Sequence, residues 1–111
     1  MNYIKVTQWL TGLSLPERAK ALNIVSYRLT IHAREYDSMD QSSLSKKLLG
    51  INELQHILLS QTGHYMDGEE DKVYPVDVFS KSLIEIADQH GIANALASAI
   101  GYVRAKIPGR R

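Results

Sequence analysis

The sequence predicts an all-α fold, a single-domain antiparallel bundle of four main helices plus a short N-terminal helix. Apolar residues recur with the period of an α-helix along almost the whole chain, and no stretch alternates apolar and polar residues as a hairpin strand would. Residues that start and stop helices divide this pattern into segments with short connections, which favours antiparallel packing of consecutive helices. The chain has 111 residues, 44% of them hydrophobic, which is typical of one globular domain.

The first two helices are delimited by residues with strong preferences for helix ends. A short helix over residues 3–11 should stop at Gly12. Ser14 can cap the next helix with its hydroxyl, and Pro16 suits the first turn because it has no amide proton to leave unpaired. This second helix should continue to about residue 36, before the turn-rich segment DSMDQSS.

Three further helices follow from similar signals. The third should run from about Ser43 to about Tyr65 and is followed by the loop DGEEDKVY. Pro75 opens the fourth, and Gly91 ends it through the left-handed backbone conformation that glycine tolerates. The fifth should cover residues 92–106.

Composition and charge narrow the classes of function. The chain has no cysteine, which excludes thiol catalysis, zinc–thiolate sites and disulfide scaffolds. Its formal net charge of +1 does not mark a general nucleic-acid binder. It shows no signal-peptide pattern and no apolar run near the roughly 18 residues of a membrane span, so we expect a cytoplasmic protein without a membrane contact. One domain is expected over residues 1–107, with a short basic tail over 108–111.

The second helix carries two apolar faces where a surface helix would carry one. Leu22 and Leu29 belong to the wider face, and Ile24, Tyr27 and Ile31 lie nearly opposite. A fully central helix is hard to arrange in a domain with four main helices. We therefore expect a homo-oligomer with Ile24, Tyr27 and Ile31 at or near the contact.

Polar residues interrupt the apolar face of the third helix. Gln55 and Thr62 project from its middle, and a buried amide or hydroxyl without a hydrogen-bond partner costs on the order of 1–3 kcal/mol. Such residues usually fix the register between helices. The alternative is a polar pocket formed by Gln55, Thr62 and His32, as in a sensor of a small ligand or a metal.

The histidines and acidic residues do not match a metal site. Glu53 and His56 have the Glu-x-x-His spacing of di-iron bundles, but the pattern occurs once and Glu53 falls opposite the apolar face. His56 and His64 are separated by about 12 Å along a regular helix, too far to share one ion. The sequence also lacks a nucleophile elbow and a phosphate-binding loop. We expect no metal, no cofactor and no enzymatic activity.

The acidic run after the third helix is the main candidate for function. It contains Asp67, Glu69, Glu70 and Asp71 and lacks the ligand pattern of a calcium-binding loop. It is either a solvated loop or a contact surface for a basic protein, where complementary charge would speed encounter. Our hypothesis is a small non-enzymatic protein that acts by protein–protein interaction, as a neutraliser of the immunity or antitoxin kind or as a regulator.

Basic residues near the C-terminus support a competing hypothesis. Arg104, Lys106, Arg110 and Arg111 gather in the last helix and the tail. A regulator that binds nucleic acid could use them, because each phosphate that is neutralised releases counterions. No recognition helix of the helix-turn-helix type is evident beside them.

Overall fold

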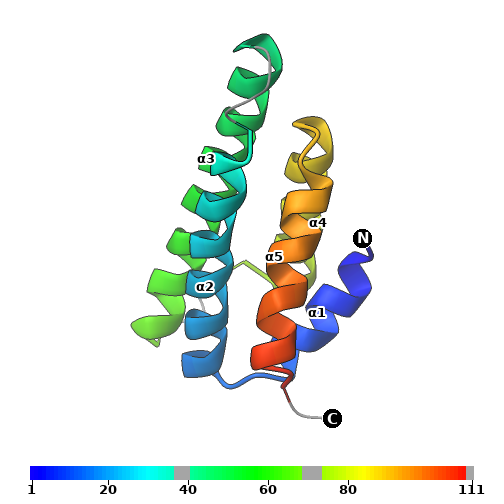
Figure 1. Cartoon of the computed structure of the whole chain (residues 1–111). Helices are drawn as coiled ribbons and strands as arrows, with labels where there is room; N and C mark the ends of the chain where they lie inside the picture. The colour runs from blue at the N-terminus through cyan, green and yellow to red at the C-terminus, as the bar shows by residue number, and fades with distance from the viewer. Residues whose placement is uncertain (37–40, 69–73, 110–111) are drawn as a thin grey trace.

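A computed structural model describes residues 1–36, 41–68 and 74–109. Within these ranges the chain forms one globule of five α-helices without a strand, which confirms the predicted all-α class (Figure 1). None of these helices is both long and apolar enough to cross a membrane. The helices are α1 (Tyr3–Thr11), α2 (Leu15–Arg34), α3 (Gln41–Met66), α4 (Val76–Gln89) and α5 (Ala93–Lys106).

Local signals in the sequence account for the ends of α2 and α4. The Ser14 hydroxyl accepts a bond from the Glu17 amide, and the Glu17 carboxylate accepts one from the Ser14 amide, so the two residues form a capping box. Pro16 occupies the first turn of α2, as predicted. After α4, Gly91 has a φ of 68°, the left-handed conformation expected of it.

Helix α2 packs against both α3 and α5, whereas α4 packs against α1, α3 and α5 (Figure 1). The shared core is apolar and draws on every helix. Its largest fully buried side chains include Leu10, Leu22, Leu29, Leu54, Leu58, Phe79, Leu83 and Leu96.

The short helix α1 is an integral part of this core. Its residues Val6, Trp9 and Leu10 are buried. The Trp9 indole Nε1 donates a hydrogen bond of 2.7 Å to the carbonyl oxygen of Ile107, just after α5. A Cβ atom at Gly109 would lie 3.2 Å from Cδ2 of Leu13, so the described part of the predicted tail, residues 108–109, packs against the junction of α1 and α2.

The two apolar faces of α2 have different environments. Leu22 and Leu29 are fully buried, and Ile24, on the second face, is half-buried and packs against the edge of the core. Tyr27 is 67% exposed, and Ile31 is half-buried. Because α2 contacts α3 and α5 at once, much of its breadth is covered within one chain, and an oligomer contact at the second face stays a prediction.

Two glycines of α3 provide a matched test of how closely α3 approaches the end of α4. A Cβ atom at Gly50 would lie 2.5 Å from Cβ of His90, whereas one at Gly63 would meet no heavy atom within 4 Å. We expect Gly50→Ala to lower the free energy of unfolding by about 1–3 kcal/mol through overpacking. Gly63→Ala should raise it by about 0.5–1 kcal/mol because alanine favours a helix. Urea denaturation followed by circular dichroism measures both, and stabilisation by Gly50→Ala would contradict the close packing.

Candidate functional site

One line of exposed side chains runs along the outer surface of α2. Lys20, Tyr27 and Arg34 follow one another at intervals of seven residues, which is close to two helical turns, so they share one stripe. All three are exposed. The stripe extends for about 21 Å at 1.5 Å per residue.

A second line of exposed side chains runs along α3 and is apolar. Leu48, Leu59 and Met66 are separated by eleven and seven residues, again close to whole numbers of turns. Their exposed fractions are 37%, 50% and 74%. Because large apolar side chains are usually buried, such a line on the surface is a candidate contact.

Hydrogen bonds across the seam between α2 and α3 show that the two lines border one groove. The Gln55 amide Nε2 donates to the carbonyl oxygen of Ser26 at 2.9 Å and to Oγ1 of Thr30 at 2.7 Å. Seven residues further along α3, Thr62 shares a pocket with Ala19, which lies seven residues earlier than Ser26 in α2. The two helices therefore run in opposite directions along the seam.

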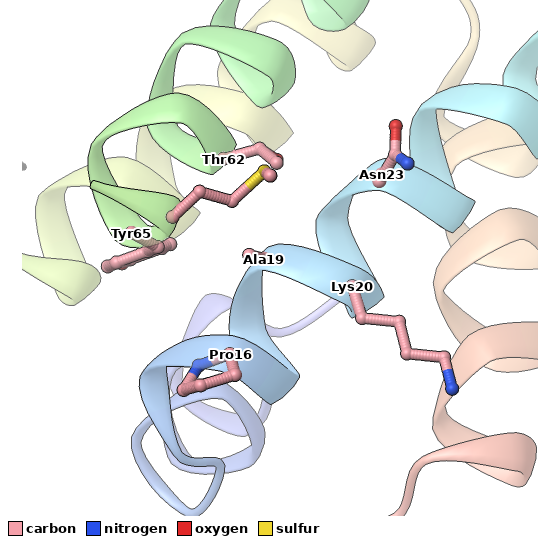
Figure 2. A pocket seen from close by; sticks show the side chains of 7 residues that line it. Pro16, Ala19, Lys20, Asn23, Thr62 and Tyr65 are labelled. Atoms are coloured by element: carbon pink, nitrogen blue, oxygen red, sulfur yellow. The ribbon is translucent and has the colours of Figure 1, made fainter. Parts of the chain in front are cut away.

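The pocket lies between the N-terminal part of α2 and the C-terminal part of α3, and its volume is about 440 Å³ (Figure 2). Thr62 Oγ1 already donates to the carbonyl oxygen of Leu58, and the Tyr65 hydroxyl accepts from Nε2 of Gln61. The Lys20 side chain extends away from Tyr65 (Figure 2). The pocket thus offers mainly apolar surface, and its lining residues are Pro16, Ala19, Lys20, Asn23, Thr62, Tyr65 and Met66.

We call this surface the α2–α3 groove: the lines Lys20, Tyr27, Arg34 and Leu48, Leu59, Met66, with the pocket at one end. Its two sides differ in charge. The α2 residues 18–34 contain four arginines or lysines and neither aspartate nor glutamate. The α3 residues 54–66 contain no aspartate, glutamate, lysine or arginine. Positive charge in the groove therefore comes from α2.

The three residues of the predicted polar pocket have different environments. Gln55 lies in the seam, whereas Thr62 lines the pocket of Figure 2 and Gln55 and His32 do not. Nδ1 of His32 lies 3.3 Å from Oε2 of Glu35, one turn further along the chain. Nε2 of His32 is buried without a hydrogen-bond partner. Burial and, secondarily, the charge of Glu35 raise the pKa of Tyr36 above its ordinary value.

The sequence interpretation missed Gln61, which is the buried amide of this region. Its Nε2 donates to the Tyr65 hydroxyl and to the carbonyl oxygen of Tyr74, each at 3.2 Å, and its Oε1 accepts from the Tyr74 amide. Gln61 therefore joins α3 to the segment that precedes α4. The i, i+4 spacing of Gln61 and Tyr65 was the available signal.

Glu53 and His56, singled out by their spacing, do not form a pair. Glu53 Oε2 instead lies 3.5 Å from Nε2 of His90, after α4, and Nδ1 of His90 lies 3.0 Å from the carbonyl oxygen of Lys46. His56 is exposed. Within the described ranges, no three aspartate, glutamate or histidine residues lie close enough together to hold a metal ion.

The predicted charged sites are described in part. Asp67 is exposed directly after α3, at the Met66 end of the groove, whereas Glu69, Glu70 and Asp71 lie outside the described residues. On α5, Arg104 and Lys106 are exposed, and Arg110 and Arg111 lie outside the described residues.

No protein-family model, curated protein or solved structure matches this chain. The functional argument therefore proceeds from the surface and chemistry of the molecule itself. The α2–α3 groove is the candidate site because it joins exposed apolar side chains, a pocket and a charge of one sign.

The two amides of α3 differ in how much they should matter for stability. Gln61→Met removes the side-chain bonds to both backbone groups of Tyr74, and we expect it to lower the free energy of unfolding by about 1–3 kcal/mol. Gln55→Met, the matched control, removes bonds at a half-buried position and should cost about 0.5–1 kcal/mol. Chemical denaturation compares the two, and an equal or larger loss for Gln55→Met would contradict the greater role of Gln61.

Proposed function

We propose that this chain is a non-catalytic protein that acts by binding another protein, and that the α2–α3 groove is its binding surface. The biological role would be that of a neutraliser of the immunity or antitoxin kind, or of a regulator, in the cytoplasm. The scaffold in this proposal is the antiparallel four-helix bundle with its short N-terminal helix. The observation that carries the proposal is the exposure of Tyr27, Leu59 and Met66 beside one apolar pocket.

Exposed apolar groups of this kind support binding to a protein. Tyr27 and Met66 are residue types enriched at the cores of protein interfaces. Burying their exposed apolar surface in a contact would contribute about 25 cal/mol for each Å² removed from water. The pocket could receive one anchoring side chain of a partner, which is the arrangement typical of an interface hot spot.

The polar groups at the pocket also favour a binding role. The hydroxyls of Thr62 and Tyr65 are engaged in hydrogen bonds inside the protein. A polar substrate would have to compete for them, whereas an apolar side chain would leave them undisturbed. Selectivity in this proposal comes from shape and from charge at the rim.

The acidic run has a supporting part in this proposal. Asp67 adjoins the Met66 end of the groove, and the sequence continues with Glu69, Glu70 and Asp71. Negative charge there would attract a basic group of the partner at that end and increase the rate of encounter.

Nucleic-acid binding is the second candidate. Helix α5 contains no aspartate or glutamate and exposes Arg104 and Lys106, which favours a phosphate contact. Binding of DNA or RNA that weakens steeply with salt would support this candidate.

Two isoleucine or leucine positions with the same exposure test the protein-binding proposal. Leu59 in the groove and Ile4 on α1 are each 50% exposed. We expect Leu59→Glu to reduce recovery of a bound protein by about tenfold or more, because a carboxylate would be buried in the contact. Ile4→Glu should leave recovery unchanged. Affinity purification from the source cells, quantified by mass spectrometry, measures both variants.

Circular dichroism is used to check that both variants are folded. Full recovery of the same proteins by Leu59→Glu, or an equal loss with Ile4→Glu, would contradict a binding role for the groove.

A further inference from the structure

The charge distribution in the α2–α3 groove identifies the kind of partner that fits it. We propose that the groove binds an amphipathic helix of another protein, with acidic residues along the flank that faces α2. This inference rests on the proposed function and specifies the partner for the same surface. It draws on the length of the groove, the position of the pocket and the sign of the charge on each side.

The dimensions of the groove suit a helix. Lys20 and Arg34 mark a length of about 21 Å, which a helix of about four turns would cover. The seam between α2 and α3 is held by the bonds from Gln55 to Ser26 and Thr30, so its floor is fixed. An amphipathic helix that lays its apolar face into such a groove is a recurring mode of peptide recognition.

Apolar anchors on the floor occur at intervals that a helix can match. The pocket beside Met66 lies at one end, Tyr27 and Leu59 follow, and Leu48 lies towards the other end. A helix that presents apolar side chains at positions i, i+3 or i+4, and i+7 would meet the pocket and these side chains in turn.

The rim determines where the partner carries charge. Lys20 and Arg34 are exposed along the α2 side, with no carboxylate between them in the sequence. The α3 side is uncharged up to Asp67, which would repel an acidic residue placed beside it. An acidic flank therefore fits against α2 and is disfavoured on the α3 side at that end. This asymmetry specifies one orientation of the partner about its own axis.

A second copy of this chain fits the groove less well. Lys20 and Arg34 are each seven residues from Tyr27. In an antiparallel two-fold pairing of α2 centred on Tyr27, Lys20 of each copy would face Arg34 of the other, so like charges would meet twice. Single-stranded nucleic acid would satisfy these two cations. It would leave Leu48 without the aromatic face on which bases stack.

Designed peptides test this inference directly. The probe is a fluorescein-labelled helix of about 18 residues with leucine at the i, i+3, i+4 and i+7 positions and glutamate along one flank. One control replaces each glutamate by lysine, and another has the same composition in an order without helical periodicity. We expect fluorescence anisotropy to show that the acidic helix binds at least about tenfold more tightly than either control.

Charge-reversal variants locate the bound peptide. We expect Lys20→Glu with Arg34→Glu to weaken binding by about tenfold or more. The matched control is Lys5→Glu with Lys81→Glu, two exposed lysines on α1 and α4, which changes net charge equally and should weaken binding by less than about threefold. Lys20→Gln with Arg34→Gln, a milder change, should give an intermediate loss if the reversal disturbs the fold.

Several results would overturn the inference. These are equal binding of the acidic and control peptides, an equal loss in the two charge-reversal variants, displacement of the peptide by oligodeoxythymidine at lower concentration, or a dimer of the unmodified chain that Leu59→Glu dissociates. If Leu59→Glu loses its cellular partner while the acidic helix does not bind, the inference fails and the proposed function stands. If the helix binds and Leu59→Glu retains every cellular partner, the proposed function fails.

Discussion

The packing of α2 against both α3 and α5 is the constraint on which the rest of the fold depends. To face two helices, α2 buries a broad arc that includes Ala21, Leu22, Val25 and Leu29. The small side chain of Ala21, which is fully buried, allows a close approach that a longer residue would prevent. The remaining arc of α2 then carries the exposed stripe of the groove. One packing arrangement thus determines both the core and the surface that is left for a partner.

The groove also shows why its apolar side chains are compatible with a stable monomeric fold. The core beneath it is closed by Leu54 and Leu58, which are fully buried on the inner face of α3. Leu59 and Met66 add little to that core because they are at least half exposed. Surface residues that contribute little to folding are free to serve recognition, and their replacement should change binding more than stability.

The helix limits were largely predictable from the sequence because their signals are local. Gly12, Ser14 and Gly91 act through their own backbone or through neighbours a few residues away. The place of α2 between two helices was not predictable, because periodicity gives the width of an apolar face and does not identify its neighbours. The environment of Gly50 depends on His90, forty residues later in the sequence. The stripe on α2 could have been recognised from its spacing of seven, whereas its pairing with α3 required the seam.

The hydrogen bond from Trp9 to Ile107 has a consequence for the order in which the molecule folds. It joins residues 98 positions apart, so it closes a loop containing most of the chain, and loop closure of that length is entropically costly until the intervening helices are packed. Docking of α1 against the end of α5 should therefore be a late step. Trp9 is also the one tryptophan of the chain. Its fluorescence would report the closing of the two ends, while circular dichroism would follow the helices that form earlier.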